Sequence, residues 1–195
     1  MNLNDEDVLK IFKSTDALLD GHFLLTSGRH SNQYFQCAKV LQYPEFTSQI
    51  CSLIAEHFKS CDIDTVIAPA MGGMIVGYEV ARQLNKRSIF TERENKEMTL
   101  RRGFTLNKGE KVLICEDVVT TGGSVFEVIE IVKMFGAQVV GIGSIVDRSN
   151  GKVDFGFPFF PSLRLNVVSY SADECELCKE GKFELVKPGS RKIIK

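Results

Sequence analysis

Two adjacent carboxylates, Glu116 and Asp117, follow four apolar residues and precede a loop of small and hydroxyl-bearing residues. The apolar run 112–115 is typical of a buried parallel strand, and ligands of open α/β sheets bind beyond the carboxyl ends of such strands. The loop 120–124, Thr-Thr-Gly-Gly-Ser, offers hydroxyls and backbone N–H groups, and a helix beginning near Ser124 adds its positive end. The segment therefore predicts a cradle for a phosphate monoester, with two acids that can accept hydrogen bonds from an adjacent ribose.

Other phosphate-binding motifs fit this chain poorly. No Gly-Lys-Ser or Gly-Lys-Thr follows the loop, which excludes a P-loop, and the pair Gly141-Ile-Gly143 lacks the third glycine of a dinucleotide fingerprint. The remaining alternative is an ordinary turn of a doubly wound fold. The sequence Glu-Asp followed by Thr-Thr-Gly-Gly at a strand end is too particular to favour that alternative.

Composition restricts the class of protein. The 195 residues suit one domain, and a formal net charge of −1 without a basic block argues against nucleic acid as a partner. The N-terminus is acidic rather than apolar, so no signal peptide is expected, and no apolar run is long enough to cross a membrane. A cytoplasmic protein is predicted.

Six cysteines occur without a disulfide framework. Four of them, Cys37, Cys51, Cys61 and Cys115, lie in apolar or helical contexts and are expected to be buried and reduced. The pair Cys175-Glu-Leu-Cys178 is half a zinc site, but the sequence shows no second pair or nearby histidine to complete it. A structural or incidental role is expected for this pair.

The elements that must position the carboxylates alternate along the chain. Helices are expected over about 5–19, stopped by Gly21, from Pro44 onward, from the loop 69–73 to about 84, and from 124 to about 135. A hairpin is expected from 22–25 and 33–36, and strands at 66–68, 88–90, 112–115, 139–146, 153–155 and 164–168. This order predicts an α/β fold with a mostly parallel central sheet flanked by helices.

The segment 112–124 resembles the fingerprint of the type I phosphoribosyltransferases. The resemblance implies that Glu116 and Asp117 are catalytic and hold the ribose hydroxyls of PRPP. It implies that the loop holds the 5-phosphate and that Gly72 and Gly73 meet the pyrophosphate. The loop residues concerned are Val118, Val119, Thr120, Thr121, Gly122, Gly123 and Ser124.

Three further segments resemble the orotate phosphoribosyltransferases within that family. The first is the segment 23–35, which resembles a small N-terminal hood (about 1–40 plus a C-terminal segment) whose Ser27, Tyr34 and Phe35 would line an orotate pocket. The second is the polar segment 90–104, which resembles a flexible lid (about 92–108). It would close over a neighbouring subunit and supply a catalytic Lys96, with Arg93 also on PRPP. The third is the segment 143–149, in which Arg148 would bind orotate together with Thr120; a salt bridge to Asp147 is the alternative.

Several positions depart from the commoner orotate enzyme pattern. Pro69-Ala-Met-Gly-Gly73 stands where Pro-Ala-Tyr-Lys-Gly is frequent, so a lysine contact to pyrophosphate is missing. Met98 replaces a frequent lid histidine, and Thr26 stands where a lysine often precedes Ser-Gly. Arg101 and Arg102 could compensate from the far side of the lid. The segment 175–191 resembles the tail of one branch of the family.

The resemblance as a whole implies one phosphoribosyltransferase domain over 1–195. The implied reaction makes orotidine 5′-monophosphate and pyrophosphate from PRPP and orotate, in a homodimer whose lid acts in trans. Mg²⁺ is the implied cofactor, held mainly by PRPP and water rather than directly by protein ligands. Two alternatives stay open: a phosphoribosyltransferase for uracil or a purine, and a PRPP-binding regulator without turnover.

Overall fold

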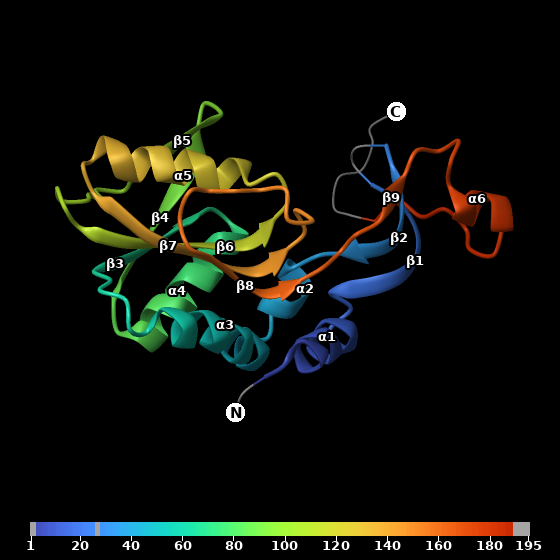
Figure 1. Ribbon diagram of the computed structural model, residues 1–195, viewed down its shortest axis with the longest axis horizontal. Coiled ribbons are helices and arrows are strands. Elements are labelled where there is room, and N and C mark those ends of the chain that lie inside the picture. Colours follow the sequence, from blue (N-terminus) through green and yellow to red (C-terminus); the bar gives the residue numbers. More distant parts are fainter. Residues whose placement is uncertain (1–2, 26–27, 189–195) are drawn as a thin grey trace.

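The protein is described by a computed structural model that covers residues 3–25 and 28–188. Its main body is a six-stranded sheet in the order β5-β4-β3-β6-β7-β8 (Figure 1). All neighbouring strands are parallel except β5, which runs antiparallel to β4. The predicted α/β class with a mostly parallel sheet is therefore confirmed. The strands are β3 (Thr65–Pro69), β4 (Arg87–Glu94), β5 (Glu97–Leu100), β6 (Lys111–Val119), β7 (Gln138–Asp147) and β8 (Phe159–Arg164).

Helices cover both faces of this sheet. Figure 1 shows α5 (Gly123–Met134) on one face and α3 (Pro44–Phe58) with α4 (Gly72–Leu84) on the other. Successive side chains of a strand point to opposite faces. Leu113 accordingly packs in the apolar cluster under α3 and α4, and Ile114 packs in the cluster under α5. Strand β6 is thus buried on both sides, and this packing fixes the position of the loop 120–124 that follows it.

A second, three-stranded antiparallel sheet occupies the region predicted as a hood. It consists of β1 (Leu18–Leu24), β2 (His30–Phe35) and β9 (Ser169–Tyr170). Helix α1 (Asp5–Ser14) packs against β1, the short α6 (Glu176–Glu180) follows β9, and α2 (Ala38–Leu41), which follows β2, packs against α3 and α4. The N-terminal segment and the C-terminal segment therefore meet in this small sheet, beside the main body (Figure 1).

The first helix is shorter than its sequence predicts. It ends at Ser14, and Gly21 lies inside β1 rather than at a helix end. The hydroxyl of Thr15 donates to the Ile11 carbonyl over 2.9 Å, and Asp16 then takes a left-handed φ of 55°. The residues that follow gain more from pairing with β2 than from another helical turn, so tertiary pairing overrides the helical pattern.

The edge of the main sheet also differs from expectation. Residues 153–155 form no strand; instead Phe155 is buried, with its ring centroid 5.0 Å from that of Phe126 on α5. The edge strand is β8, which ends at Arg164 where the predicted strand began. It contains Pro161, a residue that edge strands tolerate because one side needs no ladder hydrogen bond.

Cys61, expected to be buried, is exposed. No helix among the described residues has the length and apolar character to span a bilayer.

Candidate functional site

The acid pair lies within the last residues of β6 rather than after it. Pairing with β7 continues to Val119, opposite Asp147. The backbone N–H of Asp117 donates to Oε1 of Glu116 over 2.9 Å, and the N–H of Val118 donates to Oδ1 of Asp117 over 2.9 Å. The main chain of a doubly buried strand therefore fixes both carboxylates at the carboxyl end of the sheet.

The charge of this pair is not compensated. Burial raises the pKa of Glu116, whose exposed fraction is 8%, and the neighbouring Asp117 carboxylate raises it further. The backbone N–H of Asp117 opposes this shift. Within residues 3–25 and 28–188, neither carboxylate makes an ion pair. Such a pair is suited to accept hydrogen bonds from ligand hydroxyls or to face a cation.

The glycine pair that begins α4 lies directly against the acids. A Cβ atom on Gly72 would lie 2.1 Å from Oδ2 of Asp117, and one on Gly73 would lie 3.0 Å from Oε1 of Glu116. Only glycines allow the backbone to approach the carboxylates this closely. The structure thus brings together the acid pair and the two glycines predicted to meet pyrophosphate.

The loop after β6 forms an uncapped helix start. Gly122 has a φ of 75°, and a Cβ there would come within 2.8 Å of the Phe155 ring, so glycine is required for both reasons. No side chain caps α5, which leaves the first N–H groups of the helix without an intrahelical partner. A cavity of about 290 Å³ opens over this turn. Its lining is Arg93, Glu116, Val118, Val119, Thr120, Thr121, Gly122, Gly123, Ser124, Val125 and Glu127.

Arg93 reaches the same cavity from β4. Its guanidinium group pairs with Glu127 of α5, with Nη1 at 3.0 Å from Oε1, and Nη1 also donates to the Lys96 carbonyl over 2.8 Å. Sequence reasoning missed Glu127. A signal was present, because Glu127 lies three residues after Ser124 and so shares a face of the helix with it.

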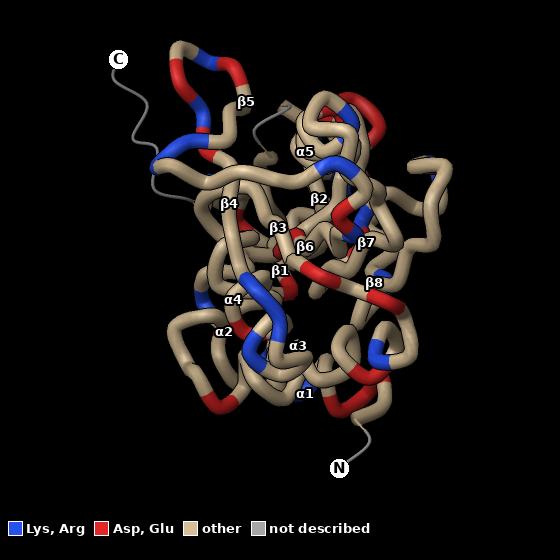
Figure 2. Tube along the Cα trace, turned by 90° about the vertical axis from the view of Figure 1, so that its left-hand side faces the viewer, with Lys and Arg blue, Asp and Glu red and all other residues tan. Residues whose placement is uncertain are grey.

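The segment predicted to be a lid contains regular structure. Residues 90–94 belong to β4 and residues 97–100 to β5, so the expected long loop is a β-hairpin up to Leu100. Lys96 lies at its tip with a φ of 75°. Figure 2 shows the hairpin projecting from the body, with charged residues along it. Lys96 does not line the cavity of its own chain.

Arg148 lies beside the site, and one of its hydrogen-bond donors has no partner among the described residues. It follows β7, and Asp147 pairs with Arg164 at 3.7 Å rather than with Arg148, which removes the alternative considered from sequence. The Nε atom of Arg148 is buried and has no hydrogen-bond partner among the described residues. Burial lowers the pKa of Arg148, and Tyr34 opposes that shift, which places the phenol near the guanidinium group.

The two aromatic residues predicted to line an orotate pocket face opposite sides of β2. Phe35 is buried, with its ring centroid 5.0 Å from that of Phe12, in the core. Tyr34 is half-buried, 5.8 Å from the Phe23 ring centroid. Adjacent strand residues cannot share a face, so only Tyr34 is directed away from the Phe12 core. Ser27 and Thr26 lie outside the described residues.

Comparison with known proteins agrees with this geometry. The model of the phosphoribosyl transferase domain family matches residues 37–162. An orotate phosphoribosyltransferase of Caldicellulosiruptor saccharolyticus is 58% identical over 191 residues, which is 98% of this chain and all of that protein. The enzyme of that name from Chlorobaculum parvum is 58% identical over 189 residues, 97% of each chain.

Similarity in structure points the same way. The crystal structure of orotate phosphoribosyltransferase from Aeropyrum pernix superposes with a TM-score of 0.70 and 26% identity, over 81% of this chain and 93% of that one. A family model that matches well over half of the chain, with full-length relatives far above 30% identity, leaves a single assignment. The chain belongs to the orotate phosphoribosyltransferase family.

Proposed function

We propose that the cavity at the end of β6 is where this chain transfers the 5-phosphoribosyl group of PRPP to orotate. The reaction gives orotidine 5′-monophosphate and pyrophosphate, a step of pyrimidine biosynthesis. The observation that carries the proposed location is the uncompensated acid pair beside an uncapped helix start, over one cavity of about 290 Å³. Ribose hydroxyls complement the first feature and a phosphate monoester complements the second.

The proposed roles divide PRPP between three segments. Glu116 and Asp117 accept hydrogen bonds from the ribose hydroxyls, and the turn 118–124 binds the 5-phosphate through backbone N–H groups and hydroxyls. The backbone at Gly72 and Gly73 faces the pyrophosphate beside the acids. The bond from C1 of the ribose to pyrophosphate loosens toward an oxocarbenium-like state, which the negative charge of the acid pair would stabilise. No protein nucleophile is needed.

The leaving pyrophosphate requires positive charge. Lys96 is proposed to supply it from the hairpin tip of a partner subunit, because it is exposed and does not line its own cavity. Arg93 already lies at the cavity but is bound to Glu127. Arrival of a phosphate group would offer this guanidinium a second anionic partner.

Mg²⁺ fits the donors of this site. Mg²⁺ prefers oxygen ligands and keeps several waters. Glu116, which lines the cavity, and the adjacent Asp117 would offer carboxyl oxygens. PRPP and water would hold most of the coordination shell. When bound, the ion neutralises the charge that develops on pyrophosphate.

Arg148 and Tyr34 are proposed to orient orotate. A buried guanidinium donor without a partner among the described residues matches a planar carboxylate or imide. Thr120, which belongs to the phosphate turn and lines the cavity, is proposed as a further contact to orotate. Ser27 remains a proposed contact from the hood. Phe35 is proposed to support Tyr34 from the core rather than to touch the base.

A homodimer is part of the proposal because the lid must reach a second active site. The face of α4 carries exposed apolar side chains: Met71 is 82% exposed and Tyr78 is 65% exposed, with Ile75 beside them. Ile75 and Tyr78 line an apolar hollow of about 480 Å³ that includes Phe90 and Phe104, at the base of the β4–β5 hairpin. A partner docked on this face would lie next to the hairpin.

A cytoplasmic location is proposed as well, in line with six free thiols.

The test is the PRPP-dependent loss of orotate absorbance in purified protein with Mg²⁺. Turnover with orotate but not with uracil or hypoxanthine supports the proposal, whereas preference for either other base would favour the alternative phosphoribosyltransferase. PRPP binding without release of pyrophosphate in the presence of any base would identify a regulator. Sedimentation of Tyr78→Asp tests the dimer face, because a charge there should produce monomers.

A further inference from the structure

Four side chains that the proposed reaction does not use converge at the outer end of the small sheet. They are His22 of β1, His30 of β2, and Cys175 and Cys178 at the start of α6. One ligand atom from each lies within 4.8 Å of the others. From the sequence, no histidine was expected to complete a site with the Cys-x-x-Cys pair. That expectation was wrong, because the fold brings the pair next to two histidines that are some 150 residues away along the chain.

The distances match those imposed by one tetrahedral ion. Zn–N bonds of about 2.1 Å and Zn–S bonds of about 2.3 Å separate two nitrogens by about 3.4 Å and a nitrogen from a sulfur by about 3.6 Å. Nε2 of His22 lies 3.1 Å from Nδ1 of His30, 3.4 Å from Sγ of Cys175 and 3.7 Å from Sγ of Cys178. Sγ of Cys178 lies 3.3 Å from Nδ1 of His30.

Hydrogen bonds alone do not satisfy this arrangement. Nδ1 of His22 lies 3.4 Å from the Phe183 carbonyl, so Nδ1–H is the donor and Nε2 keeps a single in-plane lone pair. That lone pair can accept one good hydrogen bond, yet three ligand atoms surround it. An ion at the centre would receive a lone pair from each of the four groups. The carbonyl contact would then orient the ring, as an outer-shell partner does in metal sites.

Burial and charge suit a closed structural site. His22, His30 and Cys175 are buried, while Cys178 is exposed and leaves a path for the ion. Two thiolates and two neutral imidazoles around a divalent cation give a neutral assembly, which avoids leaving a net charge inside the protein. All four positions of a tetrahedron are taken by protein, as in structural zinc sites.

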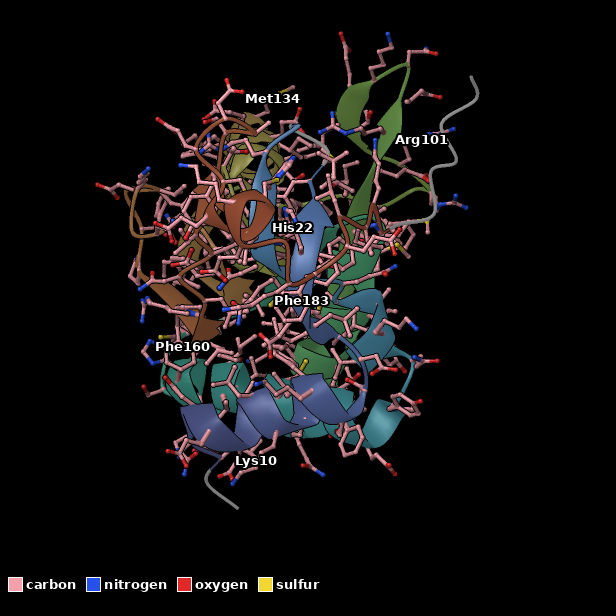
Figure 3. The ribbon with its side chains drawn as sticks, turned by 90° about the vertical axis from the view of Figure 1, so that its right-hand side faces the viewer. Lys10, His22, Arg101, Met134, Phe160 and Phe183 are labelled. Carbon is pink, nitrogen blue, oxygen red and sulfur yellow. The ribbon has the colours of Figure 1, made fainter. Side chains whose placement is uncertain are left out.

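The location explains what such an ion would do. Phe23 and Cys175 are buried but belong to neither of the two apolar clusters of the molecule, so the outer end of the small sheet lacks a core of its own. Small units of this kind depend on a metal or disulfide. In Figure 3 the C-terminal ribbon passes over the strand that carries His22. Hydrogen bonds between Val186 and β1, such as Leu24 N–H to the Val186 carbonyl at 2.8 Å, hold the tail there.

We propose that His22, His30, Cys175 and Cys178 bind one zinc ion that joins β1, β2 and the C-terminal segment. Thiolate and imidazole ligands in a tetrahedron favour zinc over magnesium or calcium. Binding replaces the two thiol protons, which pass to solvent, and no electron is transferred. The site is separate from the cavity at β6.

The experiment measures metal content rather than activity. The full chain is expressed with zinc and purified under reducing conditions without chelator. Elemental analysis should give one zinc per chain, and the native mass should exceed the denatured mass by about 63 Da, the mass of zinc less two protons. Cys175→Ser combined with Cys178→Ser should abolish zinc binding, whereas Cys61→Ser, which removes an exposed cysteine elsewhere, should retain it.

A second measurement keeps the proposal testable if the double variant does not fold. Wild-type protein stripped of metal and loaded with Co²⁺ should show the intense visible absorption of tetrahedral cobalt with thiolate ligands, and zinc should bleach it. Three results would overturn the proposal: less than about 0.1 equivalent of zinc after reconstitution, zinc retained by the double variant, or a Cys175–Cys178 disulfide in the reduced preparation.

Discussion

The carboxyl end of the central sheet and the outer end of the hood solve the same positioning problem by different means. At the sheet end, β6 is buried on both faces, and its backbone fixes Glu116 and Asp117. At the outer end of the hood, the buried Phe23 and Cys175 belong to neither apolar cluster of the described residues, and four side chains able to bind a metal converge there. At the sheet end, apolar packing positions the two acids proposed to bind PRPP. In the hood, bonds to a metal ion are proposed to position the strands that lie beside the orotate site.

This comparison predicts that substitutions in the acid pair at the sheet end lower activity without lowering the stability of the fold. Asp117→Asn retains the shape of the side chain but removes the charge proposed to face the ribose. We expect kcat/KM for PRPP to fall about 10³-fold, within the range for loss of a transition-state contact, with a melting temperature near that of wild type. The exposed Asp173→Asn serves as the control. A large drop in melting temperature would instead assign Asp117 to structure.

Lys96 tests whether the sheet end is complete within one chain. Lys96→Ala should lower kcat about 100-fold, because it removes the cation proposed for the leaving group; the exposed Lys152→Ala should not. Turnover within twofold of wild type would refute the assignment.

Mixing the Lys96→Ala and Asp117→Asn proteins shows whether the lysine acts in trans. A mixed dimer holds one intact site, in which the acids of one subunit meet the lysine of the other. Random exchange should therefore restore about a quarter of wild-type activity. Subunit exchange without recovery would show that the lysine acts within its own chain.

The hood should respond in the opposite way. Replacing Cys175 and Cys178 by serine should lower the melting temperature by about 5–10 °C, because the outer end loses the proposed ion that joins β1, β2 and the C-terminal segment. The KM for orotate should rise about 10-fold while the KM for PRPP stays within twofold. Cys61→Ser is the matched control. Equal changes in both KM values would mean that the hood does not act on the base alone.

The smallest expected effect is the loss of folding stability caused by the buried carboxyl group of Glu116. The pKa of Glu116 is raised in the folded protein, so its contribution to stability is complete below the unfolded pKa near 4.5. That contribution is lost as pH rises toward the folded pKa. Glu116→Gln cannot ionise and should be more stable than wild type at pH 8 by about 1–2 kcal/mol, with less difference at pH 5. Urea unfolding at both pH values measures this, with the exposed Glu97→Gln as control; an equal difference at both would contradict it.

Sequence alone predicted the sheet end well because its signals are local. The apolar run, the acids, the small-residue turn and the following helix are contiguous, and the structure realises them as β6 and α5. The contribution of Gly72 and Gly73 needed the family resemblance as well, because the contact joins the start of α4 to the end of β6, which is distant in sequence. Fold class followed from the alternation of elements in the same local way.

The rest could not be read locally. The end of α1 depends on pairing between Leu18 and Phe35, and the coil at 153–155 depends on Phe155 packing against α5. The histidine partners of Cys175 and Cys178 lie at the other end of the chain. The hairpin at 90–100 was hidden by its polar composition, because most of its strand residues are only partly buried.

The glycine at position 72 has a consequence for swapping motifs between relatives. The Asp117 carboxylate occupies the volume into which a side chain at 72 would extend, 2.1 Å from the would-be Cβ, and its other oxygen holds the Val118 N–H. Restoring the lysine that is common at this position would force Asp117 to rotate and give up that bond. The lysine and the present carboxylate orientation are mutually exclusive, so a cation can be regained here only if the Asp117 side chain turns away from position 72.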